Sequence, residues 1–177
     1  MAAPSGTARF AAGKALSVTA EKNPARVYPF FDAIAARLSS DSKVVCWNAM
    51  RILAALAGVD SQRKVDALLD RYLAFIRGGN LISAANAIRG AGRIALARPD
   101  LLNRIVPAIL EVERASFETP ECRNVAIGQA LQALRPLGAS VHSRADVAGF
   151  IRRQKSNPRT AVAACAEELT ADMKAGV

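Results

Sequence analysis

Three asparagines recur at a constant interval in this sequence. Asn48, Asn86 and Asn124 stand 38 residues apart, and Arg51 and Arg89 keep the same interval. An asparagine amide both donates and accepts hydrogen bonds, and an arginine guanidinium binds carboxylates and phosphates through several donors at once. Such residues at a fixed period indicate a binding surface built from equivalent positions of a repeat. The candidate binding residues are Trp47, Asn48, Arg51, Asn86, Arg89, Arg93 and Asn124.

No pattern of residues indicates catalysis. The sequence contains no GxSxG, Walker A or HExxH motif. Its closely spaced acidic pairs, Glu111/Glu113 and Glu167/Glu168, are neighbours that point apart on a helix and do not share a site. We therefore expect a protein that is not an enzyme and has no catalytic residues.

Metal, disulfide and cofactor sites are not expected either. Cys46, Cys122 and Cys165 are odd in number, lie among apolar residues and form no CxxC pair. The single histidine, His142, stands in a loop-like stretch without a cluster of other metal-binding side chains. We expect buried, reduced thiols in a cytoplasmic protein that holds no metal and no cofactor.

The repeated asparagines fall on the second helix of successive helix pairs. Apolar residues at three- and four-residue steps predict amphipathic first helices at 27–38, 62–76, 101–115 and 145–154. Segments that are apolar nearly all round predict second helices, covered on several sides, at 43–57, 81–97, 121–134 and 159–173. On these second helices Asn48 shares one face with Arg51, and Asn86 shares one face with Arg89.

The composition favours a single all-α domain. Of the 177 residues 51% are hydrophobic but only 5% are aromatic, and no apolar run approaches the length of a membrane span. We expect residues 1–24 to be a flexible segment with at most a short capping helix. A secretory signal is disfavoured because Lys14 interrupts it, whereas an organellar presequence stays an alternative. Residues 25–174 are expected to form one domain with units at about 26–58, 61–97, 99–138 and 143–174.

The helix pairs resemble those of the HEAT/armadillo superfamily. The stretches RILAALAGVD and AIRGAGRIALARPD are similar to its inner-helix pattern, and the resemblance covers residues 25–174. It implies a right-handed α-solenoid of about four antiparallel helix pairs, a scaffold that binds proteins, peptides or nucleic acid through its concave face. Armadillo proteins that hold extended peptides use asparagine ladders with tryptophans beside them. Here Ala85 and Arg123 stand where tryptophans equivalent to Trp47 would be, so the tryptophan array is missing.

The charge distribution favours an anionic partner. The formal net charge is +9, and no acidic residue lies between Asp70 and Asp100. We expect a scaffold that binds a partner protein or peptide through an acidic or extended segment; the alternative is a basic groove for the backbone of duplex nucleic acid, as in HEAT-like DNA-repair proteins. No membrane contact is expected. The arginines of the acid-free stretch are Arg71, Arg77, Arg89, Arg93 and Arg98, and a second basic cluster covers 152–155.

A structural interpretation competes with this binding surface. The asparagines could hydrogen-bond the backbone of the neighbouring repeat and fix the stacking register, since buried polar groups must be paired. The arginines could pair with Asp66 or Asp70 of the first helices, and Trp47 could pack in the core.

Overall fold

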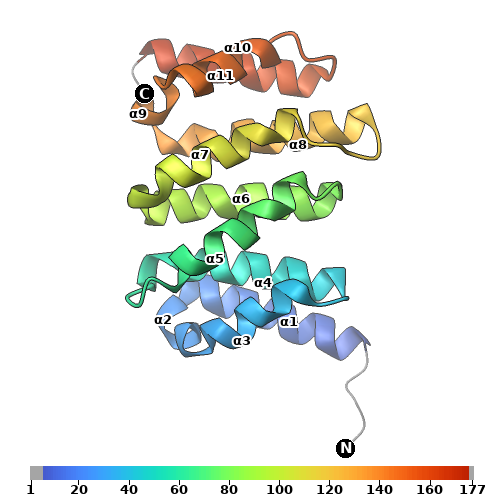
Figure 1. Ribbon diagram of the computed structural model, residues 1–177, viewed down its shortest axis with the longest axis vertical. Helices are drawn as coiled ribbons and strands as arrows, with labels where there is room; N and C mark the ends of the chain where they lie inside the picture. Colours follow the sequence, from blue (N-terminus) through green and yellow to red (C-terminus); the bar gives the residue numbers. More distant parts are fainter. Residues whose placement is uncertain (1–5, 176–177) are drawn as a thin grey trace, which may run out of the picture. The chain divides into compact units, whose positions relative to one another are not determined.

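The structure is a computed structural model that describes residues 6–175, and these residues are helical over most of their length, with no strand among them (Figure 1). The all-α class predicted from the sequence is therefore confirmed. The chain divides into two compact units, Met1–Tyr72 and Leu73–Val177. Of the N-terminal segment that the sequence predicts to be flexible, residues 1–5 lie outside the described part.

Unit 1 consists of α-helices linked by short 3₁₀ turns. Its helices are α1 (Gly6–Lys22), α2 (Pro24–Val27), α3 (Phe31–Ala36), α4 (Lys43–Leu56) and α5 (Lys64–Leu73), with turns at Tyr28–Phe30, Arg37–Ser39 and Ala57–Val59. The single helix predicted over 27–38 is wrong in detail. Pro29 has no backbone N–H to donate, and the chain forms the 3₁₀ turn Tyr28–Phe30 before α3 begins.

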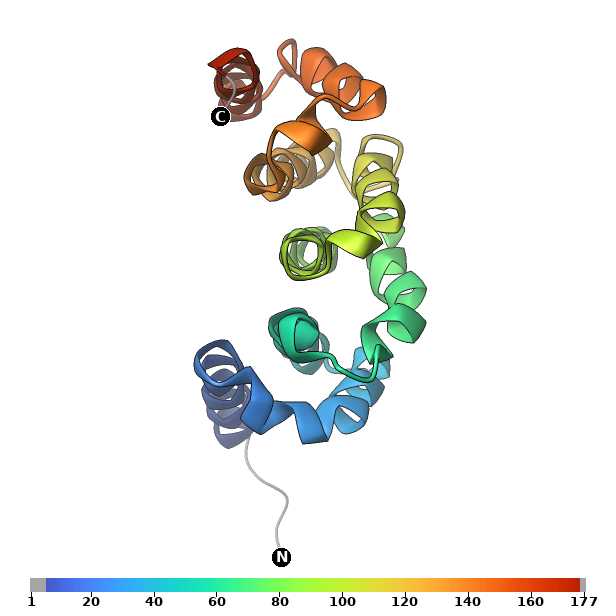
Figure 2. The same cartoon turned by 90° about the vertical axis from the view of Figure 1, so that its left-hand side faces the viewer.

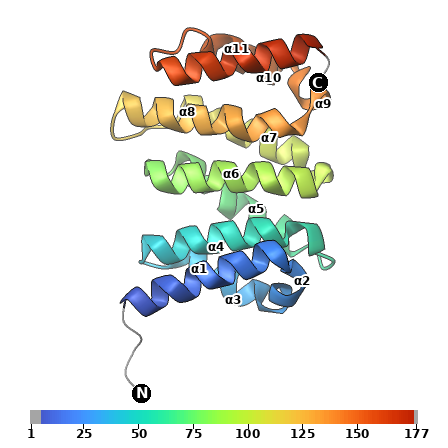
Figure 3. The ribbon, with the colours of Figure 1, turned by 180° about the vertical axis from the view of Figure 1, so that it is seen from behind.

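Helix α1 extends over 17 residues and packs against α4 (Figure 3). The buried residues of α1 are small: Ser17 is 2% exposed and Ala20 is 0% exposed. One turn before Ser17, a Cβ added at Gly13 would lie 2.7 Å from Nδ2 of Asn48. Small side chains at 13, 17 and 20 therefore let the backbone of α1 approach α4 closely.

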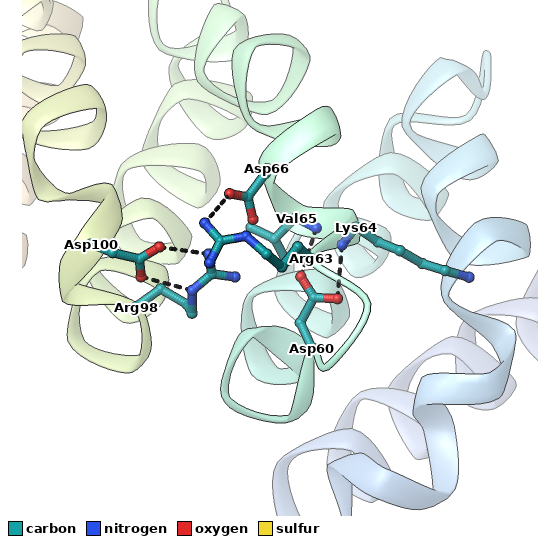
Figure 4. Close-up of polar contacts among 7 residues, drawn as sticks. All are labelled: Asp60, Arg63, Lys64, Val65, Asp66, Arg98 and Asp100. Carbon is teal, nitrogen blue, oxygen red and sulfur yellow. Dashed lines mark hydrogen bonds and ion pairs between the residues drawn. The ribbon is translucent and has the colours of Figure 1, made fainter.

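Asp60 connects the start of α5 to the segment before α3. Its Oδ1 accepts hydrogen bonds from the Tyr28 hydroxyl at 2.6 Å and from the Lys64 N–H at 2.9 Å. Its Oδ2 accepts one from the Val65 N–H at 2.8 Å (Figure 4). Asp60 is only 8% exposed, so it satisfies first-turn donors of α5 in a place that water hardly reaches. Partial burial and the hydrogen bond to Asp60 raise the pKa of the Tyr28 hydroxyl.

The Lys64 side chain provides a second connection between α5 and α3. Its Nζ lies 2.5 Å from Oδ2 of Asp32. The same ammonium group lies 6.0 Å from the ring centroid of Tyr28 and 5.9 Å from that of Phe31. The cation therefore interacts with one carboxylate and lies within reach of two aromatic faces, which helps to orient α5 within unit 1.

In its described part, unit 2 contains six α-helices, of which α6 is the longest. They are α6 (Leu81–Ala97), α7 (Leu102–Leu110), α8 (Pro120–Leu134), α9 (Ala139–His142), α10 (Ala145–Gln154) and α11 (Thr160–Ala175), of which α9 is a single turn. Short 3₁₀ turns lie at Ala74–Arg77, Pro99–Leu101, Glu111–Glu113 and Arg135–Leu137.

These helices form two layers within unit 2 (Figure 2). Helix α8 packs between α6 and α11 in one layer, and α7 packs against α10 in the other. The core between the layers is aliphatic and includes Ile88, Ile105 and Ile109, all with 0% exposure. Where α6 meets α8, a Cβ added at Gly92 would lie 3.0 Å from both the Cβ and the carbonyl oxygen of Ala133. The glycine therefore allows a close approach of the two helices.

The start of α8 agrees with the sequence pattern of a threonine followed by proline. The Thr119 hydroxyl accepts a hydrogen bond from the Cys122 N–H at 3.1 Å, and Pro120 occupies the first helical position.

We expect Thr119→Ala to lower the free energy of unfolding by about 1 kcal/mol, because the Cys122 N–H loses its acceptor. Urea unfolding followed by circular dichroism measures the change. Thr119→Ser keeps the hydroxyl, so an equal loss in that variant would contradict the capping role.

Candidate functional site

Asn48 lies at a pocket within unit 1. The pocket has a volume of about 700 Å³, is partly open to solvent, and is lined by residues of α1, α3 and α4 with the turns beside them. Most of its wall is apolar and comes from Leu16, Ile34, Val44, Val45 and Ile52. Leu16 and Val44 are each 38% exposed, which is unusual for large aliphatic side chains and follows from their place on this wall.

Polar groups line the same pocket. They belong to Arg37, Ser42 and Asn48, and among the described lining residues Arg37 is the one that carries a charge. No carboxylate of the described residues pairs with the Arg37 guanidinium, and no described residue hydrogen-bonds the Asn48 amide. Asn48 is half-buried beside Gly13 and lines the pocket, so its amide group lies at the pocket wall. Asn48 therefore has unused hydrogen-bonding capacity at an apolar pocket.

The two other candidate binding residues on α4, Trp47 and Arg51, are close to Asn48 in the sequence but do not line the pocket. Trp47 is half-buried. Arg51 is exposed, and its Nη2 lies 3.8 Å from Oε1 of Glu21 on α1. An ion pair of two exposed side chains at this distance adds little stability.

Asn86 of α6 forms its hydrogen bonds within its own helix. It is 7% exposed, and its Nδ2 donates to the carbonyl oxygen of Ile82 at 2.8 Å. Its Oδ1 accepts a hydrogen bond from Nη2 of Arg89 at 3.2 Å. Both ends of the amide are thus engaged inside α6, and one result is that the Arg89 guanidinium is held against the helix surface.

One face of α6 is exposed although most of the helix is buried. Ile82 and Leu96 are each 50% exposed, and Arg89 and Arg93 lie between them on the same face and are also exposed. The spacing 82, 89, 93 and 96 follows helical periodicity, so the four side chains form one stripe. We call Ile82, Arg89, Arg93 and Leu96 the α6 face. Ten of the 17 residues of α6 are buried, which makes two half-exposed aliphatic residues on the remaining surface conspicuous.

Asn124 belongs to a hydrogen-bonded network that holds three segments of unit 2 together. Nδ2 of Asn157 donates to Oδ1 of Asn124 at 3.2 Å and to Oε1 of Gln154 at 2.9 Å. Gln154 is 4% exposed and donates to Oε1 of Glu113 at 2.8 Å. The network extends to Arg153, whose Nε and Nη2 donate to the two carboxylate oxygens of Glu113 at 2.9 and 2.8 Å. Hydrogen bonding to Glu113 raises the pKa of Arg153.

The three asparagines are therefore not equivalent in structure. Asn48 lines a pocket of unit 1, and Asn86 forms its hydrogen bonds within its own helix. Asn124 accepts a hydrogen bond from the segment between α10 and α11. Asp66, which the sequence offers as a partner for the repeat arginines, is hydrogen-bonded by Arg63 at 2.6 Å. The bond of Asn124 to the segment between α10 and α11 is made to the side chain of Asn157, not to backbone.

The cysteines and the histidine have structural surroundings. Cys46 is buried and donates to the carbonyl oxygen of Leu38 at 3.4 Å, and burial raises the pKa of its thiol. Cys122 and Cys165 are half-buried, so the prediction of buried thiols is confirmed for Cys46 alone. His142 lies in the one-turn helix α9 and not in a loop, with Nε2 3.0 Å from the carbonyl oxygen of Leu134. Within the described part of the chain, no three metal-binding side chains come together in a group that could hold an ion.

Sequence reasoning missed Arg37, Leu16, Ile82 and Leu96. A signal for one of them was present, because Val44 and Ile82 both stand four residues before a repeated asparagine. That places an apolar residue on the same helical face as the asparagine and the arginine. Arg37 and Leu16 carry no such signal, because their role depends on how α1 and α3 pack against α4.

The comparisons with known proteins identify no relative. The chain matches no protein-family model, and it matches neither a curated protein nor a solved structure. Among the described residues, none of the helices combines the length and the apolar composition that crossing a membrane requires.

Proposed function

We propose that this protein is a non-catalytic scaffold that binds an acidic segment of a partner protein on the α6 face. The observation that carries the proposal is the exposure of two aliphatic residues and two arginines on one stripe of an otherwise buried helix. Ile82 and Leu96 are separated by about 21 Å along the helix axis. This length suits a peptide with apolar side chains at its ends and carboxylates between them.

The chemistry of the α6 face favours carboxylates over other groups. Guanidinium groups bind carboxylates through two parallel hydrogen bonds, and Arg89 is already oriented by Asn86. Pre-orientation lowers the entropy that the side chain loses on binding. The exposed aliphatic residues add apolar area that a partner would remove from water.

The proposal includes a solenoid architecture similar to that of the HEAT/armadillo superfamily. Its support is the interval of 38 residues between the asparagines of α4, α6 and α8, together with the two helical layers of unit 2. In the proposed right-handed α-solenoid of about four helix pairs, α6 belongs to the inner layer, where proteins of this architecture bind their partners. The α6 face is then part of the inner surface.

Binding to the backbone of duplex nucleic acid is the second candidate function, and the acid-free stretch from Arg71 to Arg98 favours it. Several of these arginines have partners within their own unit, however. Arg71 donates to the Ser39 hydroxyl, Nε of Arg77 lies 3.1 Å from Glu111, and Arg98 donates to both carboxylate oxygens of Asp100 at 2.8 and 2.7 Å (Figure 4). Two arginines on α6 are a small basic surface for a duplex, which binds through many phosphate contacts.

Fluorescence anisotropy tests the two candidates side by side. A labelled helical peptide of about 16 residues, with leucines near both ends and glutamates on the same face, is titrated with the full chain. We expect binding that weakens about tenfold in Arg89→Gln/Arg93→Gln, because charge-assisted hydrogen bonds are lost. Arg152→Gln/Lys155→Gln removes two exposed charges elsewhere in unit 2 and is the matched control.

The same titration with a labelled duplex separates peptide binding from binding to nucleic acid. If the duplex binds more tightly than the peptide and its affinity falls steeply between about 50 and 200 mM salt, the second candidate replaces the first. Absence of peptide binding, or equal losses in the two double variants, would contradict the role of the α6 face.

A further inference from the structure

We infer that the pocket of unit 1 binds a small amphiphile with an aliphatic chain and a carboxylate head. This site lies on α1, α3 and α4 and is independent of the α6 face. The inference rests on three features found together: an apolar cavity, a guanidinium at its wall that no described carboxylate pairs with, and an amide that no described residue hydrogen-bonds.

The apolar wall determines the main part of the ligand. Leu16 approaches from α1, Ile34 from α3, and Val44, Val45 and Ile52 from α4, so aliphatic groups from three helices face one cavity. Among the described lining residues the apolar side chains are all aliphatic, which favours a flexible hydrocarbon chain over a flat ring system. The volume of about 700 Å³ lies in the range of pockets that enclose small organic ligands.

The polar residues determine the head group. Arg37 is the charged residue of the described lining and matches a carboxylate in geometry and sign. Asn48 and Ser42 supply neutral donors, and a carboxylate has acceptor sites for several hydrogen bonds. A cationic head would be repelled by Arg37, and an uncharged one would leave the guanidinium without a counter-charge.

The lack of a side chain at Gly13 of α1 leaves space in the cavity beside the Asn48 amide. Gly13 lines the pocket where a Cβ would lie 2.7 Å from the Asn48 amide. A side chain at position 13 would push this amide aside and occupy part of the space. The glycine thus combines close packing of α1 with an amide that is free to bind a ligand.

Isothermal titration calorimetry of the full chain with sodium octanoate tests the inference, and 1-octanol is the matched uncharged probe. We expect one octanoate per chain, bound about tenfold more tightly than octanol because of the pairing with Arg37. Arg37→Gln should weaken octanoate about tenfold and leave octanol unchanged. Arg26→Gln removes an exposed arginine of unit 1 outside the pocket and should change neither affinity.

A second variant separates the pocket from general surface binding. Val44→Phe enlarges a partly exposed wall residue without touching the core, so the protein should keep its circular dichroism spectrum and lose both probes. The inference is overturned if octanoate does not bind, if octanol binds as tightly as octanoate, or if several octanoate molecules bind and Val44→Phe has no effect.

Discussion

Asp60→Ala is expected to lower the free energy of unfolding by about 3 kcal/mol, the largest loss among the single substitutions considered for this protein. The carboxylate accepts hydrogen bonds from the Tyr28 hydroxyl and from the backbone N–H groups of Lys64 and Val65. With Asp60 only 8% exposed, water replaces these acceptors poorly, and donors left unpaired in a buried place are costly. Urea unfolding followed by circular dichroism gives the value.

Two further variants show whether the loss comes from these hydrogen bonds. Asp60→Asn keeps one acceptor oxygen, so it should cost clearly less than Asp60→Ala. Tyr28→Phe removes the donor to Asp60 and the hydroxyl oxygen that accepts from the Gln62 N–H at 3.3 Å. It should cost about 1–2 kcal/mol in the wild-type background and about 1 kcal/mol less once Asp60 is alanine. Additive effects of Tyr28→Phe and Asp60→Ala would show that the pair is not coupled and would contradict the account.

Gly92→Ala is expected to lower the free energy of unfolding by up to about 2 kcal/mol, although alanine favours helix more than glycine does. The added Cβ would lie 3.0 Å from the Cβ and the carbonyl oxygen of Ala133, so the backbones of α6 and α8 must separate. Overpacking of this kind costs about 1–3 kcal/mol, while the gain in helix propensity offsets about 1 kcal/mol. Thermal and urea unfolding of the purified variant measure the net effect.

Gly78→Ala is the matched control for Gly92→Ala. Gly78 has φ −74°, and a Cβ added there would meet nothing closer than 3.5 Å. This substitution should be neutral or stabilising by up to about 1 kcal/mol, because alanine restricts the unfolded chain. A stabilising effect of Gly92→Ala similar to that of Gly78→Ala would show that α6 and α8 are not closely packed at this point.

The second helices could be predicted closely because their boundaries are marked by local chemistry. Helix α6 has the predicted bounds 81–97: Asn80 caps its start by accepting from the Ser83 N–H at 3.0 Å, and Pro99 follows its end. Among the first helices, α10 has the predicted bounds 145–154, whereas the other three are shorter than predicted. The pattern over 101–115 is one amphipathic run, but α7 ends at Leu110 and continues as the 3₁₀ turn Glu111–Glu113, because apolar periodicity does not distinguish the two kinds of turn.

Helix α1 could not be predicted at its full length. Its apolar residues do not follow one strong stripe, and the helix is stabilised by packing of the small residues Ser17 and Ala20 against other parts of unit 1. Since α1 supplies Leu16 and Gly13 to the pocket, the pocket could not be predicted either. The side-chain partners of Asn86 and Asn124 also depend on the local fold, whereas the regular spacing alone suggests that all three asparagines are equivalent.

The α6 face was predicted in part. Arg89 was identified from the repeat interval and Arg93 from its place on the same helical face, and both are exposed. Ile82 and Leu96 read as core residues in an apolar helix, and their exposure shows only in the packed unit. Asn86 beside them is buried and, among the described residues, hydrogen-bonds only within α6, so the arginines and the aliphatic residues are the groups that a partner can reach.

An exchange of charges between protein and peptide tests the proposed α6 face most directly. Arg89→Glu/Arg93→Glu is titrated, by fluorescence anisotropy, with the acidic peptide and with a version in which its glutamates are lysines. The account predicts that the variant loses the acidic peptide and binds the lysine peptide, while the original chain does the reverse. If the variant still binds the acidic peptide, the α6 face is not where an acidic partner binds. The same conclusion holds if the folded variant binds neither peptide while the original chain binds both peptides.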